Sequence, residues 1–88
     1  MDEVTERGKL VIRADVLTAK HRLNPRQRKL VLHLLAQPEI DLHGYLSICP
    51  GVPRRTLQRD LQQAVSKRVA VAKGSTHKKR YSLNPKAL

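Results

Sequence analysis

Aromatic residues are nearly absent from this chain. Its 88 residues include no Phe and no Trp, and only Tyr45 and Tyr81 carry a phenol ring. A hydrophobic core must therefore be built from Leu, Val, Ile and Ala. The shortage also argues against binding of single-stranded nucleic acid, in which bases stack on aromatic side chains. A chain of this length forms one small domain of modest stability.

Cysteine and long apolar runs are also scarce. The lone Cys49 excludes an internal disulfide, which fits a reducing compartment. No apolar run approaches the length of a membrane span, and Met1 to Leu10 does not resemble a signal peptide. We therefore expect a cytoplasmic protein, or a fragment of one.

The sequence holds no recognisable set of catalytic or metal-binding residues. His21, His33, His43 and His77 do not form a metal-ligand spacing with Cys49. No nucleophile–base–acid set and no glycine-rich phosphate loop can be found. We expect Cys49 to be buried and His33 to lie in the core or at an interface. The sequence thus predicts no enzyme, no metal site and no cofactor.

Acidic residues are few, so the chain is strongly basic. Eighteen Lys and Arg against seven Asp and Glu give a formal net charge of +11, and residues 42–88 hold ten basic residues and one acid, Asp60. This density predicts a polyanionic partner, either nucleic acid or an anionic membrane. A membrane-binding helix needs an apolar face rich in Trp, Phe or Leu. Because the apolar residues here are committed to a core, we favour nucleic acid and expect no membrane partner.

The first 22 residues form a segment distinct from the rest. Residues 1–8 are polar, and Leu10, Ala14 and Leu17 then share one helical face, which favours an extra N-terminal helix. The run Leu10-Val11-Ile12 would also suit a strand. We expect segment 1–22 to cover the domain or to pair with a second copy in a homodimer. The domain itself is expected at residues 23–84, with a tail at 85–88.

Helix-start signals are strong after residue 23. Asn24 can cap a helix, Pro25 suits its first position, and Gln27 can complete a capping box. The residues that follow, through Ala36, are apolar around much of the helical circumference. They predict a central core helix that ends before Pro38.

A helix, a glycine-containing turn and a second helix follow. Residues 39–41 suit a short extended piece, after which Asp41 can cap a helix from Leu42 to about Cys49. Gly51 can adopt the left-handed conformation that redirects the chain. This order is that of a helix-turn-helix. The side chains that we expect the first of these two helices to bury are Leu42, Tyr45, Leu46 and Cys49.

The second helix, spanning residues 53–68, is strongly two-sided. At 100° per residue, its apolar side carries Leu57, Leu61, Ala64 and Val65. Its polar side carries Arg55, Arg59, Gln62, Gln63 and Ser66. Guanidinium and amide groups pair with guanine and adenine edges in a DNA major groove. The alternative is an ordinary solvated face on a surface helix.

Residues 69–83 predict a β-hairpin, in which two apolar segments flank a basic tip that contains Gly74. Tyr81 and Leu83 should face inward, whereas Arg80 and Ser82 should face out. The predicted fold class is mainly α with a small β-hairpin. It is a winged helix-turn-helix, with a three-helix core, the hairpin as the wing and an extra N-terminal helix.

The sequence of the second helix also resembles a known motif. Residues 51–61, GVPRRTLQRDL, resemble the GVSxRTxxRDL string of DeoR-type regulators and are similar to the winged-helix domain at the C-terminus of Fic-family proteins. Residues 73–83 resemble the wing and its closing YxL strand. The resemblance covers about residues 23–83 and implies a winged helix-turn-helix DNA-binding domain.

Two residues depart from the family pattern. Pro53 replaces the usual Ser, which removes the expected side-chain cap. Arg68 replaces the usual Gly after the recognition helix, where a positive φ would cost a non-glycine residue about 1 kcal/mol. We therefore expect the turn into the first wing strand to differ, or Arg68 to meet a phosphate.

Residues of the recognition helix are expected to contact DNA. Arg55, Gln58 and Arg59 are assigned to base edges. Thr56 and Arg54 are assigned to the phosphate backbone. Asp60 is expected to be structural, by pairing with an Arg of the first helix of the domain or by orienting Arg59, because an acid beside DNA would be repelled.

The wing is expected to contact phosphates or a minor groove. Its candidate residues are Lys73, Ser75, Thr76, His77, Lys78, Lys79 and Arg80. The predicted function is sequence-specific binding of double-stranded DNA at the nucleoid, by a small transcriptional regulator or by the DNA-binding domain of a larger protein. The alternatives are a protein-interaction module and a module that binds structured RNA.

Overall fold

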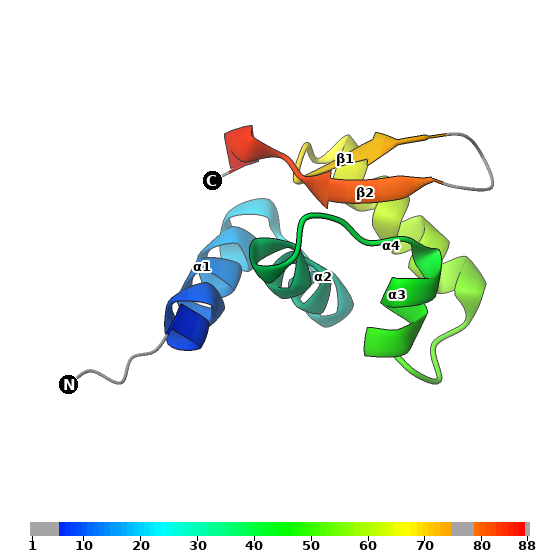
Figure 1. Ribbon diagram of the computed structural model, residues 1–88, viewed down its shortest axis with the longest axis horizontal. Helices are drawn as coiled ribbons and strands as arrows, with labels where there is room; N and C mark the ends of the chain where they lie inside the picture. Colours follow the sequence, from blue (N-terminus) through cyan, green and yellow to red (C-terminus); the bar gives the residue numbers. More distant parts are fainter. Residues whose placement is uncertain (1–5, 75–78, 88) are drawn as a thin grey trace.

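The computed structural model describes residues 6–74 and 79–87 of the chain (Figure 1). Its fold is a winged helix-turn-helix with an extra N-terminal helix, as the sequence predicted. The elements in order are α1 (Glu6–His21), α2 (Pro25–Ala36), α3 (Leu42–Ile48), α4 (Arg54–Ser66), β1 (Ala70–Lys73), β2 (Arg80–Leu83) and a 3-10 helix, η1 (Pro85–Ala87). No helix in the described part of the chain is long and apolar enough to cross a membrane.

The first helix, α1, is continuous through Leu10-Val11-Ile12, so the alternative of a strand there is wrong. Ala14 and Leu17 are buried. The helix ends where Arg22 takes a positive φ of 54° and the Leu23 amide donates to the Thr18 carbonyl at 2.9 Å. This is the hydrogen bond of a Schellman-type helix end.

The predicted capping box starts α2. The Asn24 side chain accepts from the Gln27 amide at 2.7 Å, and the Asn24 amide donates to Gln27 Oε1 at 3.0 Å. Pro25 takes the first helical position, as expected. The helix ends at Ala36, two residues before Pro38.

Helix α3 is capped by Asp41, whose Oδ1 accepts from the Gly44 amide at 2.8 Å. Of the four side chains expected to be buried, Tyr45 and Cys49 are buried, whereas Leu42 and Leu46 are only partly covered. Gly44 weakens a short helix but has a steric reason to be there. A Cβ at this position would lie 2.7 Å from Ile40 Cγ1.

The two ends of α4 show how the structure accommodates Pro53 and Arg68, the two residues that depart from the resembled motif. Pro53 precedes the helix and makes no side-chain cap. At the other end Arg68 takes a positive φ of 62°, its amide donates to the Val65 carbonyl, and the Val69 amide donates to the Ala64 carbonyl, each at 2.9 Å. These bonds form a Schellman motif. The expectation of a different turn is wrong, because Arg68 adopts the left-handed conformation that suits glycine.

The hairpin is antiparallel, with Ala70 opposite Leu83 and Lys73 opposite Arg80. Ile40 forms a bridge to Tyr81, with N···O distances of 2.9 and 2.8 Å, so the extended piece before α3 ties the hairpin to the helices. Tyr81 is buried and Arg80 is exposed, as predicted. Leu83 and Ser82 are both partly covered.

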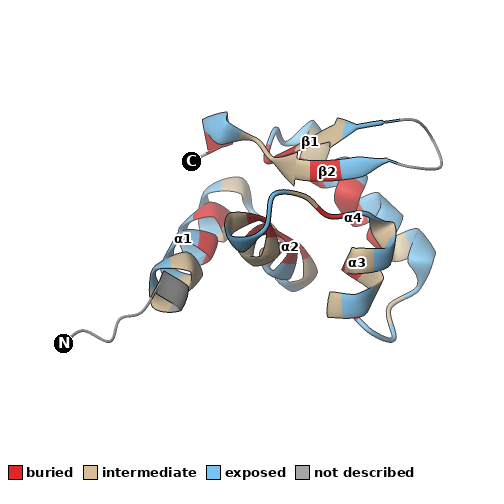
Figure 2. Cartoon of the chain, in the orientation of Figure 1, coloured by how far each residue is buried: buried red, intermediate tan, exposed pale blue. Residues whose placement is uncertain are grey.

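The core consists of two clusters that share α2, which is therefore the central helix that the sequence predicted. Figure 2 shows the buried residues on the faces that adjoining elements turn toward one another. The first cluster contains Leu30, Leu34, Ile40, Tyr45, Cys49, Leu57, Leu61, Ala64, Ala70 and Tyr81. The second contains Ala14, Leu17, Leu23, Val31, Val69 and Ala87. Because Ala87 is buried, η1 packs on the domain.

Candidate nucleic-acid interface

Helix α4 separates its two faces as the sequence predicted. Leu57, Leu61 and Ala64 are buried in the core. The residues exposed on the other side are Arg54, Arg55, Gln58, Arg59, Gln62, Gln63 and Ser66. The apolar side holds α4 against α2 and α3, so the polar side is presented to solvent by a well-packed helix.

The exposed side of α4 and the hairpin line one groove of about 1210 Å³. Helices α3 and α4, strand β2 and the segments beside them contribute to its walls. From α4 come Arg54, Arg55, Gln58, Arg59, Leu61 and Gln62; from the hairpin come Gly74, Lys79, Arg80 and Tyr81; from the start of α3 come Asp41, Leu42 and His43. Side chains that are more than twenty residues apart in sequence therefore meet in one concave surface.

The groove is strongly basic. It is lined by three arginines of α4 and by Lys79 and Arg80 of the hairpin, against one acid, Asp41. Asp41 already accepts the hydrogen bond that caps α3. None of the ion pairs between described residues involves Arg54, Arg55 or Arg59. Their guanidinium groups are therefore available to acceptors on a ligand.

Among the groove cations, Arg80 is the one that forms an ion pair with an acid within residues 6–74 and 79–87. Its Nη1 lies 2.8 Å from Glu39 Oε1, and this hydrogen bond, together with the charge of Glu39, raises the pKa of Arg80. Both side chains are exposed, so the pair contributes little to stability. A phosphate at this position would compete with Glu39 for the guanidinium.

The structure places the other predicted contact residues as follows. Thr56 is partly covered at the start of α4 and Lys73 is exposed at the end of β1, and neither is among the groove-lining residues. Ser75, Thr76, His77 and Lys78 lie outside the described residues. Gln62 lines the groove but was not among the predicted site residues. Its spacing of four residues from Gln58 and three from Arg59 was the signal that could have found it.

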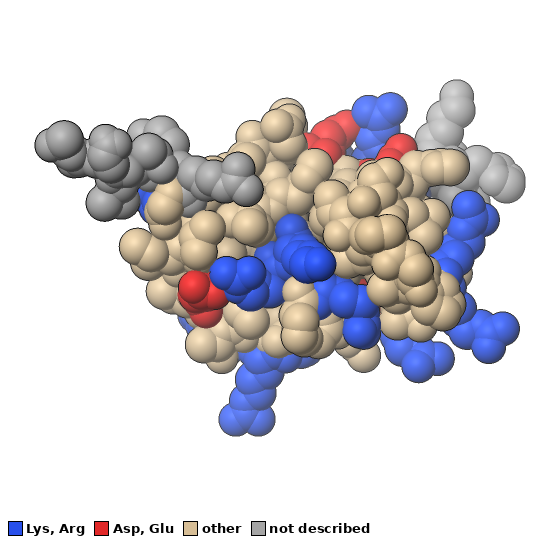
Figure 3. Space-filling model, turned by 90° about the horizontal axis from the view of Figure 1, so that it is seen from below, with Lys and Arg blue, Asp and Glu red and all other residues tan. Residues whose placement is uncertain are grey.

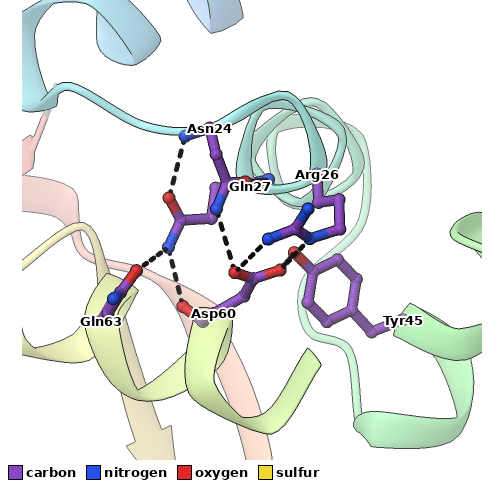
Figure 4. A network of polar contacts seen from close by, with 6 residues as sticks. All are labelled: Asn24, Arg26, Gln27, Tyr45, Asp60 and Gln63. Atoms are coloured by element: carbon purple, nitrogen blue, oxygen red, sulfur yellow. Dashed lines mark hydrogen bonds and ion pairs between the residues drawn. The ribbon is translucent and has the colours of Figure 1, made fainter. Parts of the chain in front are cut away.

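A buried polar network fixes α4 relative to α2 and α3 (Figure 4). Asp60 of α4 has a side chain that is only 3% exposed, and Arg26 binds it with both Nε (2.6 Å) and Nη2 (3.1 Å). Asn24 Nδ2 donates to it at 3.0 Å, and the Tyr45 hydroxyl donates at 3.2 Å. The prediction that Asp60 is structural and pairs with an Arg of the first domain helix is confirmed.

The network sets the ionisation of its members. Burial alone would raise the pKa of Asp60, but the hydrogen bonds from Arg26 and Asn24 and the Arg26 charge lower it overall. Burial, and then the neighbouring Asp60 charge, raise the pKa of Tyr45 far above its usual value. Asp60 is thus held as a carboxylate and Tyr45 as a neutral donor.

Gln27 extends the same network in a way that the sequence did not reveal. It is buried, and its Nε2 donates to the Asp60 carbonyl at 3.0 Å and to Gln63 Oε1 at 3.3 Å. Gln63 therefore faces α2, whereas its neighbour Gln62 faces the groove. The capping-box pattern identified Gln27 as a helix-start residue but carried no information about its long-range partners.

The charge distribution over the molecule agrees with the composition. On the face shown in Figure 3, Lys and Arg side chains project along the lower and right edges, and acidic side chains are few. Two described acids besides Asp60 are paired, Asp15 with Arg28 at 2.6 Å and Glu39 with Arg80.

Comparisons of the chain with protein-family models, with curated proteins and with solved structures find no match.

Proposed function

We propose that this protein binds double-stranded DNA with sequence preference, with α4 in the major groove and the hairpin against the neighbouring backbone. The observation that carries the proposal is the single basic groove shared by Arg55, Gln58 and Arg59 of α4 with Lys79 of the hairpin. The resemblance of residues 51–61 to DeoR-type regulators supports it. The protein would act at the nucleoid as a transcriptional regulator, or as the DNA-binding part of a larger one.

The exposed side of α4 supplies groups suited to base edges. An arginine fork can bond both acceptors of a guanine, and a glutamine can pair with adenine. Arg55, Gln58 and Arg59 are assigned to this role, and Gln62 joins them because it lines the same groove. Specificity then depends on side chains that a rigid helix positions.

Backbone contacts are assigned to the remaining cations. Arg54 at the first position of α4 and Lys79 beside β2 flank the groove, so each is suited to a phosphate on one of its rims. Arg80 joins them when it exchanges Glu39 for a phosphate oxygen. Thr56, Lys73, Ser75, Thr76, His77 and Lys78 remain predicted backbone contacts.

A mobility-shift comparison of duplex DNA, duplex RNA and single-stranded DNA tests this proposal. The expected result is preference for duplex DNA, lost in the double variant Arg55→Ala/Arg59→Ala but retained in Lys29→Ala. Lys29 is an exposed cation of α2 outside the groove, so this variant controls for the loss of a positive charge elsewhere on the surface, one charge against the two of the test variant. Preference for duplex RNA would favour the structured-RNA alternative. Failure to bind any nucleic acid would favour a protein-interaction module.

A further inference from the structure

Helix α1 carries more apolar surface than its contact with α2 can cover. Ala14 and Leu17 are buried in the second core cluster. Ile12 and Val16, however, are 61% and 59% exposed, and they are the exposed large hydrophobic residues of the described chain. A helix that packs on one neighbour needs a single apolar stripe. Here a second stripe faces solvent.

The second stripe lies on the side of α1 that points away from the domain. Ile12 and Val16 are one helical turn apart, and each is about 160° around the helix from Ala14. Ala19 continues the stripe and is also exposed. We call Ile12, Val16 and Ala19 the outer face of α1.

Charge decides which partner this face suits. Residues 1–21 contain four basic and four acidic residues and sum to zero, whereas residues 22–88 contain fourteen basic and three acidic residues and so carry the whole net charge of +11. Two copies that approach through the surfaces formed by residues 22–88 meet stronger like-charge repulsion than two that approach through α1, whose residues 6–21 carry four basic and two acidic side chains. The N-terminal segment is where a second copy can come close.

We infer that the outer face of α1 pairs with the same face of a second copy about a two-fold axis. Two branched side chains and an alanine bury far less than the roughly 1,200 Å² of total area typical of stable complexes. The free protein is therefore mainly monomeric at ordinary concentrations. Pairing becomes appreciable when DNA holds two copies side by side and raises their effective concentration.

The position of α1 makes this pairing compatible with DNA binding. In Figure 1, α1 lies at one end of the molecule, and α3 and the start of α4 lie at the other. Dimerisation through α1 leaves both basic grooves open and relates them by the two-fold axis. A symmetric pair of grooves suits inverted half-sites spaced in phase with the helical repeat of DNA. This inference deepens the proposed function. It rests on that function only for cooperative binding to DNA, because the contact between two copies can also be measured without DNA.

The test measures cooperativity on duplexes that carry one or two inverted copies of a site selected from a random library. For the wild type, we expect the second copy to bind about 5- to 150-fold more tightly than the first, at spacings of whole helical turns and not at half-turns. Ile12→Ala/Val16→Ala keeps good helix formers on an exposed face, so it should fold normally and bind one half-site with unchanged affinity. It should lose the cooperativity.

A charge variant and its control complete the design. Val16→Glu places two like charges in the symmetric contact and should also abolish cooperativity. Gln37→Glu makes the same change in charge at an exposed residue after α2 and should retain it. Cooperativity that survives Ile12→Ala/Val16→Ala, or independent binding by the wild type at every spacing, overturns the inference while leaving the proposed function intact.

A measurement without DNA separates the two proposals. Sedimentation equilibrium at protein concentrations up to about 1 mM should detect weak self-association of the wild type, absent from Ile12→Ala/Val16→Ala. If the protein binds no duplex but shows this self-association, the proposed function fails and the dimer contact stands. If the wild type shows neither cooperativity nor self-association, the dimer contact is refuted.

Discussion

At the scale of single residues, Asp60 matters most for holding α4 in place. Its carboxylate accepts hydrogen bonds from Asn24 and Arg26 at the start of α2 and from Tyr45 of α3, but none from Arg59. The side chain of Arg59 is therefore left exposed in the groove. A carboxylate that is buried beside an arginine and a tyrosine is stabilising only while all three are present. This dependence makes the site sensitive to single substitutions and to acid.

Replacing Asp60 should destabilise the protein and change its response to pH. Asp60→Asn removes the charge that Arg26 and Tyr45 contact, and we expect a loss of about 2 kcal/mol in the free energy of unfolding, since Arg26 reaches solvent and is only partly stranded. Chemical denaturation at pH 7 measures it. Asn24→Ala, which removes one neutral donor, should cost less.

The pH dependence has a defined sign. The folded-state pKa of Asp60 is lowered from 3.8, so the unfolded chain binds a proton before the folded chain does. The stabilisation is complete above about pH 4 and is lost as the pH falls through the folded-state pKa. The wild type should therefore lose stability below pH 4 more steeply than Asp60→Asn. Parallel curves for the two proteins would contradict the ionised state of Asp60.

Arg68 offers a test of backbone strain. Its φ of 62° suits glycine, so Arg68→Gly should stabilise the fold by up to about 1 kcal/mol. Lys67 next to it has a φ of −81°, and Lys67→Gly should destabilise instead. Thermal unfolding of the two variants measures the contrast. An equal shift in both variants would mean that the left-handed turn carries no strain.

At the scale of elements, the two faces of α4 should separate stability from binding. Leu57→Ala and Leu61→Ala each remove a fully buried branched side chain and should cost about 2–5 kcal/mol. Gln62→Ala, on the exposed face of the same helix, should change stability by less than about 0.5 kcal/mol. Denaturant unfolding provides both values. A large loss of stability for Gln62→Ala, together with small losses for the two leucine variants, would mean that the buried and exposed faces of α4 have been assigned the wrong way round.

The recognition helix and the hairpin should differ in what they recognise. Arg59→Ala should lose about 1–3 kcal/mol of binding free energy on the preferred site and relax preference at one base pair. Lys79→Ala should weaken all duplexes about equally and reduce the salt slope by about 1. Affinities on the selected site, on its single-base variants and on an unrelated duplex distinguish the two. If Lys79→Ala changes the base preference and Arg59→Ala weakens all duplexes alike, the hairpin reads the bases and α4 contacts the backbone.

Local signals predicted the elements well because their causes are local. The capping box at Asn24 and Gln27, the cap at Asp41 and the two-sided pattern of α4 each depend on residues a few positions apart. The partners of Gln27 in α4 and the bridge from Ile40 to Tyr81 connect residues 33 or more positions apart. Such contacts depend on how the elements pack, which periodicity does not specify. For the same reason the burial of Ala87 was not predicted.

The same distinction applies to the candidate site. Helical spacing alone assigned Arg55, Gln58 and Arg59 to the exposed face of α4. It did not predict that Gln62 and Gln63, adjacent in sequence, would face the groove and α2 respectively. It also did not predict the ion pair of Arg80 with Glu39, because that pair forms only when the extended piece before α3 joins the hairpin.

At the scale of the whole molecule, the charge is divided between two regions. The neutral N-terminal segment carries the exposed apolar face of α1, and the remainder carries the net charge of +11 and the basic groove. In the proposed dimer, this division would bring two copies together through α1 and leave each basic groove to the proposed DNA partner. Without the anion, repulsion between the charged regions should keep the self-association of the protein weak.

The dependence of duplex DNA affinity on salt tests the central claim most directly. If each domain neutralises about six phosphates, the logarithm of the association constant should fall against the logarithm of salt concentration with a slope near −5. Fluorescence anisotropy with a labelled duplex between about 50 and 200 mM salt would give this slope. A slope near −5 for the wild type, shallower in Arg54→Ala/Lys79→Ala, whose side chains are assigned to phosphates, is the predicted result. A slope near zero at measurable affinity would contradict an interface built on the basic groove.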